Sequence, residues 1–207
     1  MANVLPFNDA NLTSNDFLLM DTSFILAYSG YDTLTKGRAD LVPRKMECNN
    51  LISKIIDADA MFAISTVTYE ELLSIIQRDF FKQNQCSTES DKKRLRSLDP
   101  DKYSKIIQMA MDETNDYIMN LKKINNYYPD IVGNTDYMLL QLANDIQNKY
   151  QIHGLQDAKQ IAIAIKEKFT HYVTVDHDFN NVNCDQLQIL VDKNTCLLYT
   201  SPSPRDI

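Results

Sequence analysis

The hydrophobic positions of this chain fall into short continuous runs and into longer stretches with helical spacing. Short apolar runs predict buried strands at about 17–20, 60–65, 171–175 and 187–191. Runs without polar alternation are typical of parallel strands that are covered on both faces. Apolar residues spaced i, i+3, i+4 and i+7 predict helices at about 22–28, 45–57, 103–124, 135–150 and 157–169, and a further helix opens at about 66. Residues 1–16 show neither pattern and are expected to be an irregular lead-in.

This order of strands and helices predicts an α/β protein with more helix than strand, arranged as a three-layer parallel sheet. A chain of 207 residues is most economically one domain with a sizeable core, and we expect it to occupy residues 1–195. The long helices at 103–124 and 135–150 are expected to pair antiparallel. They would form an enlarged helical lobe, at about 82–152, inserted into the sheet domain.

Acidic residues stand where the predicted strands end and the following helices begin. Asp21 and Asp176 end two strands, whereas Glu71 and Asp157 lie in the first turns of helices. In a parallel α/β sheet both kinds of position lie at the same edge, so the four carboxylates are expected to meet there. Unpaired carboxylates at close range repel one another unless they bind protons or a cation. Oxygen ligands without histidine or cysteine favour Mg²⁺ or Mn²⁺, ions that activate water for phosphodiester hydrolysis.

Each acid also has an ordinary structural explanation. An aspartate after a strand, such as Asp21, commonly forms a turn or caps a helix. Thr68 and Glu71 have the spacing of a capping box. Asp157 stands where the dipole of a helix favours negative charge. The site hypothesis therefore depends on whether the fold brings the four acids together.

The charge of the chain restricts how it can contact nucleic acid. The net charge is −7 and the sequence pI is about 4.9, so the overall field repels phosphates. A local excess of basic residues lies within 82–105, and its densest part predicts phosphate contacts at Lys92, Lys93, Arg94 and Arg96. The same run also fits a solvated helix face or a mobile loop.

Cysteine spacing and hydropathy indicate the compartment. The four cysteines are widely separated and form neither a zinc motif nor a disulfide framework: Cys48, Cys86, Cys184 and Cys196. The first sixteen residues lack the apolar segment of a secretory signal, and no apolar run approaches the length of a membrane span. We therefore expect a cytoplasmic protein.

The last residues, 196–207, resemble a translated sequencing adapter that has been read through in frame. We expect this tail to be disordered and give it no part in the fold or the site. On this interpretation the natural carboxyl terminus is unknown.

Four segments of the chain, taken in order, resemble the motifs of PIN-domain ribonucleases. They are Leu19–Ser23 (LMDTS), Ser65–Leu72 (STVTYEEL), Leu155–Ala158 (LQDA) and Val173–Phe179 (VTVDHDF). Each motif is short, but their succession over about 17–191 is specific. The resemblance implies a PIN-like fold and an Mg²⁺- or Mn²⁺-dependent endoribonuclease that hydrolyses single-stranded RNA.

The resemblance also implies roles for individual residues. The metal would be held by carboxylates, with the last as an additional ligand: Asp21, Glu71, Asp157, Asp176 and Asp178. Two hydroxyl side chains, Thr22 and Thr174, would orient these acids or the attacking water.

Several interpretations stay open within this resemblance. The segment between Glu71 and Asp157 is longer than in the compact toxins of the family, which weakens an assignment as the toxin of a toxin–antitoxin pair. A nuclease that acts on DNA and a catalytically silent PIN-like interaction module are the alternatives. A HAD-type phosphatase is excluded because Ser23 stands where it needs a second acid. Dimers are common in the family, but no feature of this sequence identifies an interface or an antitoxin.

Overall fold

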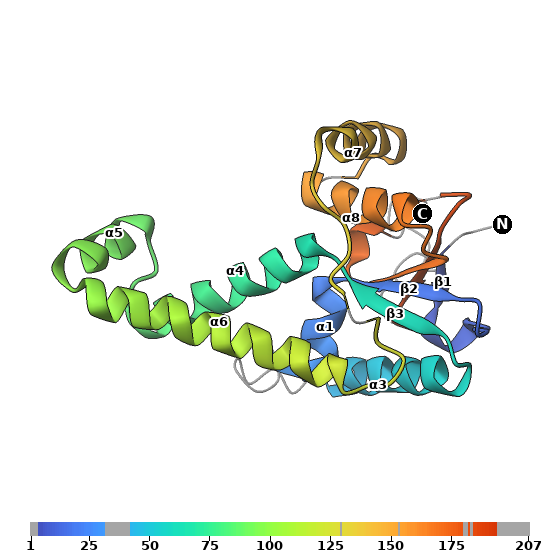
Figure 1. Cartoon of the computed structure of the whole chain (residues 1–207), viewed down its shortest axis with the longest axis horizontal. Coiled ribbons are helices and arrows are strands. Elements are labelled where there is room, and N and C mark those ends of the chain that lie inside the picture. Colours follow the sequence, from blue (N-terminus) through green and yellow to red (C-terminus); the bar gives the residue numbers. More distant parts are fainter. Residues whose placement is uncertain are drawn as a thin grey trace, which may run out of the picture.

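The centre of the structure is a sheet of five parallel strands. The computed structural model describes residues 4–31, 42–128, 130–152, 154–179, 182 and 184–193. The strands are β1 (Val4–Pro6), β2 (Phe17–Met20), β3 (Met61–Ile64), β4 (His171–Val173) and β5 (Gln188–Val191). Their spatial order is β1-β5-β4-β2-β3, and each neighbouring pair is parallel (Figure 1). The predicted α/β class with a parallel sheet is confirmed.

Helices cover both faces of this sheet. They are α1 (Thr22–Ser29), α3 (Val42–Asp57), α4 (Thr66–Gln83), α5 (Glu89–Leu98), α6 (Pro100–Lys122), α7 (Tyr137–Tyr150) and α8 (Leu155–Lys166). Figure 1 shows α1 and α3 on one side of the sheet and α7 and α8 on the other. Two 3-10 turns, η1 (Phe7–Asp9) and η3 (His177–Phe179), complete the described elements.

Successive residues of β2 pack into two different cores. Leu18 and Met20 belong to the cluster formed with α1 and α3, whereas Leu19 belongs to the cluster formed with α7 and α8. This division follows from the two-residue repeat of a strand, which turns neighbouring side chains to opposite faces. Because both faces are covered, both sets of positions must be apolar. The continuous apolar run in the sequence is the direct consequence.

The expectation of an irregular lead-in over residues 1–16 is wrong for residues 4–9, whereas residues 10–16 contain no helix or strand. Val4–Pro6 forms strand β1, which pairs with β5 at the edge of the sheet, and Phe7 is buried beside Phe24 with ring centroids 5.7 Å apart. Three residues that end in a proline carry no recognisable strand pattern. Only pairing with the last strand of the chain makes this segment a strand.

The expected antiparallel pair of long helices is also wrong. α6 packs on α4 and α5, whereas α7 packs on α8. In Figure 1, α4, α5 and α6 form an arm that extends away from the sheet, and α7 lies on the other side of the molecule. The arm has a small core of its own, made of Phe81, Cys86 and Ile106.

The connection between α6 and α7 explains why these helices do not meet. The chain runs along the edge strand β3, where the backbone nitrogen of Phe62 donates to Asn126 and that of Thr66 donates to Val132, both at 3.0 Å. The segment therefore carries the chain across the open edge of the sheet. α7 begins on the face opposite to the one that α6 has left.

Three further sequence-based expectations concern the carboxyl-terminal tail, the cysteines and the absence of a membrane span. The tail at 196–207 and Cys196 lie outside the described residues. The three described cysteines, Cys48, Cys86 and Cys184, are buried. No described helix combines the length and the apolar character needed to cross a membrane.

The position of Phe7 generates a prediction about the lead-in. Phe7 is 1% exposed, so Phe7→Ala should lower the free energy of unfolding by about 3–5 kcal/mol, measured by urea denaturation. Leu98→Ala, at a residue that is 73% exposed, should change it by less than about 0.5 kcal/mol. Equal effects of the two substitutions would show that β1 and η1 are not part of the core.

Candidate functional site

A pocket opens where the strands of the sheet end and the helices α1, α4 and α8 begin. Its volume is about 340 Å³, and its lining residues are Asp21, Thr22, Ser23, Leu26, Glu71, Ser74, Ile75, Asp157 and Asp176. The four acids predicted from the sequence to meet at one edge therefore line one pocket, although 155 residues of chain separate the first from the last. Two of them follow strands and two belong to helices.

Asp21 is the most deeply placed of the four acids. It follows β2 directly, and its backbone nitrogen donates to the carbonyl of Val173 at 2.9 Å, so the β2–β4 pairing extends to the pocket. The side chain is 6% exposed. Its Oδ2 atom accepts hydrogen bonds from Ser23 Oγ at 2.6 Å and Thr174 Oγ1 at 2.8 Å. Burial raises the pKa of the Asp21 carboxyl, and these two donors act in the opposite direction.

Glu71 is held by a threonine of a neighbouring helix. Thr22 Oγ1 donates to Glu71 Oε2 at 2.8 Å, which joins the first turn of α1 to the second turn of α4. Burial raises the pKa of Glu71, and the nearby charges of Asp21 and Asp176 raise it further. The contact places Thr22 where it can orient this acid.

The capping-box explanation of Glu71 is wrong. α4 begins at Thr66, and its N-cap is Ser65, whose hydroxyl accepts a hydrogen bond from the backbone nitrogen of Thr68 at 2.9 Å. Thr68 is therefore inside the helix and cannot be its cap. The carboxylate of Glu71 turns toward the pocket instead.

Asp157 lies in the first turn of α8, over the N-cap residue Gly154. A Cβ atom at Gly154 would lie 2.5 Å from Asp157 Oδ2, so the absence of a side chain there gives the carboxylate its room. Burial raises the pKa of Asp157 to about 7, and the charges of Asp21, Glu71, Asp176 and Asp178 add to this effect. The pocket thus holds negative charge that its own residues do not compensate.

Asp176 and Asp178 belong to the turn that follows β4. The backbone nitrogen of Asp178 donates to Asp176 Oδ1 at 3.0 Å, which fixes the side chain of Asp176. Asp178 is exposed and is not among the residues that line the pocket. Its charge nevertheless acts on Asp157, so Asp178 lies at the margin of the pocket.

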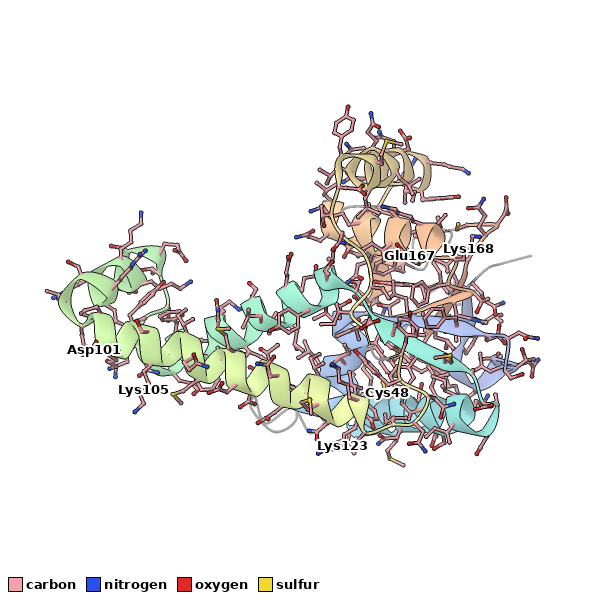
Figure 2. All side chains as sticks on the ribbon, in the orientation of Figure 1. Cys48, Asp101, Lys105, Lys123, Glu167 and Lys168 are labelled. Carbon is pink, nitrogen blue, oxygen red and sulfur yellow. The ribbon has the colours of Figure 1, made fainter. Side chains whose placement is uncertain are left out.

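The basic residues predicted to contact phosphates lie elsewhere. Lys92, Lys93, Arg94 and Arg96 are all on α5, at the outer end of the arm (Figure 1). Figure 2 shows Asp101 and Lys105 near the same end of the arm, far from Cys48 in the sheet domain. Lys92 Nζ forms an ion pair with Glu89 at 2.6 Å, so its charge is partly neutralised. The structure does not bring these residues to the acidic pocket.

A buried glutamine supports the pocket and was not singled out from the sequence. Gln160 Oε1 accepts hydrogen bonds from Ser65 Oγ at 2.7 Å and from Thr68 Oγ1 at 3.1 Å. These two donors fix the orientation of the amide, so Gln160 Nε2 faces Asp21 Oδ1 at 3.4 Å. The sequence feature that could have identified Gln160 is its position as a polar residue on the apolar face of the helix, next to Ile161. A buried amide on such a face needs partners.

The donor set of the pocket fits a hard divalent cation. The carboxylate oxygens are of the kind that Mg²⁺ and Mn²⁺ prefer, and no lysine or arginine is among the lining residues. As the described side chains stand, no group of three or more Asp, Glu, His or Cys is arranged to coordinate an ion. The pocket therefore suits a divalent cation by the type of its donor atoms and by its negative charge.

The raised pKa of Asp157 generates a prediction for the metal-free protein. The Asp157 carboxyl binds its proton more tightly in the folded state than in the unfolded state. The free energy of unfolding therefore falls as the pH rises from about 4 to about 7. Asp157→Asn removes this carboxyl. The variant should therefore gain stability relative to the unsubstituted protein as the pH rises, by about 1–2 kcal/mol at pH 8 after allowance for partial exposure.

Urea denaturation at pH 4 and pH 8, with a chelator present, measures this difference. Asp145→Asn changes an exposed aspartate of α7 in the same way and should show no such gain. A gain for Asp157→Asn that is the same at both pH values would contradict the prediction.

Comparison with known proteins adds no relative for this site. No family model matches the chain, and neither a curated protein nor a solved structure matches it. The assignment of the pocket is based on its lining residues and their charge.

Proposed function

We propose that the protein is a metal-dependent endoribonuclease that hydrolyses phosphodiester bonds of single-stranded RNA. The proposal is based on one observation. A single pocket is lined by four acids: Asp21, Glu71, Asp157 and Asp176. Segments that are distant in the sequence deliver these acids to the carboxyl edge of a parallel sheet, where ligand sites form in α/β proteins. The resemblance of the surrounding motifs to PIN-domain ribonucleases supports the same reaction. We therefore also propose that the fold is PIN-like.

The four acids would hold Mg²⁺ or Mn²⁺, with Asp178 at the margin as an additional ligand. The ion supplies charge neutralisation at the phosphate and a water of lowered pKa. Hydroxyl donors hold two acids in place: Thr22 bonds Glu71, and Ser23 and Thr174 bond Asp21. Because these donors leave the remaining lone pairs of the acids free, the carboxylates can still accept a ligand from the pocket side.

The arm is the proposed surface for the flanking RNA. α4 starts beside the pocket with Glu71 and leads outward to Lys82, and α5 then carries Lys92, Lys93, Arg94 and Arg96. Backbone phosphates are the part of RNA that such a run of positive charge attracts without regard to sequence. In an acidic protein α5 carries more basic than acidic residues, so a phosphate chain is attracted to it.

The proposal also covers the compartment, the substrate and the partners of the enzyme. We propose a cytoplasmic protein with RNA as substrate. The family resemblance also leaves open an antitoxin partner and a homodimer, and a nuclease that acts on DNA is the alternative within the same chemistry. A catalytically silent interaction module would keep the fold but would neither bind the ion nor cleave RNA.

The proposal predicts cleavage of a defined single-stranded RNA in the presence of Mn²⁺ and none with a chelator. Glu71→Gln should lower the cleavage rate at least about 100-fold, because even residues that only support a metal ligand commonly contribute 10–100-fold. Cleavage is measured by gel electrophoresis of end-labelled RNA, with a DNA of the same sequence in parallel.

Glu70→Gln is the matched control for this experiment. Glu70 is the exposed neighbour of Glu71 on α4 and is absent from the pocket, so its variant should cleave at the unsubstituted rate. No cleavage by the unsubstituted protein with Mn²⁺, on either RNA or DNA, would favour the silent module.

The arm generates a separate prediction about salt. Replacing Lys93 and Arg94 by serine should weaken RNA binding and reduce the slope of log affinity against log salt concentration by about 1 for each lost phosphate contact. Fluorescence anisotropy at several salt concentrations measures the slope. The pair Lys122 and Lys123, at the other end of α6, provides a control of equal charge. Identical slopes for both double variants would place the RNA elsewhere.

A further inference from the structure

Tyr172 is a completely buried tyrosine beneath the acidic pocket. It lies on β4, where it pairs in register with Leu19 of β2, and its ring packs on Phe179 with centroids 4.9 Å apart. Its hydroxyl has no hydrogen-bond partner within ordinary distance among the described residues. Buried hydroxyls are nearly always paired, so an unpaired one needs an explanation.

The surroundings of the hydroxyl point to Asp21. Asp21 follows Leu19 by two residues, so strand geometry turns both toward the face on which Tyr172 lies. Burial raises the pKa of the Tyr172 hydroxyl well above its usual value, and the charges of Asp21, Asp157 and Glu71 contribute in that order. The hydroxyl therefore lies in the field of the three acids, with Asp21 the strongest neighbour.

The carboxylate of Asp21 has capacity for another donor. Its Oδ2 atom already accepts from Ser23 and Thr174. Its Oδ1 atom accepts a long contact of 3.4 Å from Gln160 Nε2, and hydrogen bonding from Tyr172 contributes to lowering the pKa of the Asp21 carboxyl. A carboxylate has room for about four hydrogen bonds or ligands.

We propose that Tyr172 is a positioning residue of this pocket: its hydroxyl donates to the Asp21 carboxylate from the sheet side. With Ser23 and Thr174 it would occupy three of the four positions of the Asp21 carboxylate. The fourth, on Oδ1, where Gln160 makes only its long contact, would then face a divalent cation. Hydrogen bonds to a ligating carboxylate act in this way, by orienting the ligand. The inference rests on the proposed function, because it assumes that Asp21 binds a cation.

The test compares two buried tyrosines, one beside the acidic pocket and one in the core away from it. Tyr172→Phe and Tyr127→Phe each remove one buried hydroxyl without a hydrogen-bond partner in the described structure and leave the ring in place. Tyr127 packs on Phe62 in the core on the α1 side and is absent from the pocket lining. Mn²⁺ affinity of the full chain is measured by isothermal titration calorimetry, and stability by urea denaturation.

Tyr172→Phe should weaken Mn²⁺ binding about 10-fold or more, whereas Tyr127→Phe should leave it within about twofold. Gln160→Met, which keeps the size of the side chain but removes the amide, should weaken it in the same direction. A purely structural role would lower stability in both tyrosine variants without separating their affinities.

The possible results separate this inference from the proposed function. If the unsubstituted protein binds no Mn²⁺, the proposed function is wrong and the inference falls with it. If it binds Mn²⁺ and Tyr172→Phe binds equally well, the inference alone is wrong. A Tyr172→Phe protein that does not fold would also overturn it, because the hydroxyl would then be structural.

Discussion

The main physical constraint on the pocket is the mutual repulsion of carboxylates at the carboxyl edge of the sheet. Asp21 and Glu71 are drawn together by the fold, and burial deprives them of the water that would otherwise screen their charge. Hydroxyls of Thr22, Ser23 and Thr174 hold the acids at fixed positions. This arrangement costs stability in the isolated protein, and under the proposed function a divalent cation would offset the repulsion.

The edge of the sheet does not create such a site by itself. Asp192 also follows a strand, β5, and is completely buried, but Arg44 Nε lies 3.2 Å from its Oδ2 atom. That acid has its positive partner within the chain. The pocket differs because no basic side chain is among its lining residues, although it gathers four acids. Asp192 thus belongs to a structural ion pair, whereas no basic side chain is among the residues that line the acidic pocket.

The two long helices extend the molecule in different directions for a reason that lies in the edge strand. The chain after α6 follows β3 through hydrogen bonds at Phe62 and Thr66, then continues on the opposite face. The arm is thereby left to pack on itself, while α7 and α8 cover the sheet. One consequence is a surface of positive charge, on α5, that stands apart from the acidic pocket.

The sequence alone determined the strands β2, β3, β4 and β5, because a strand buried on both faces is apolar at nearly every position; only His171 and Gln188, at the starts of β4 and β5, are polar. It also determined that four acids meet at one edge, since parallel topology puts strand ends and helix starts together. Strand β1 and the separation of α6 from α7 were decided by tertiary contacts, which short local patterns do not record. The same holds for Gln160 and Tyr172, because the meaning of a buried polar atom depends on which neighbour from a distant segment it faces.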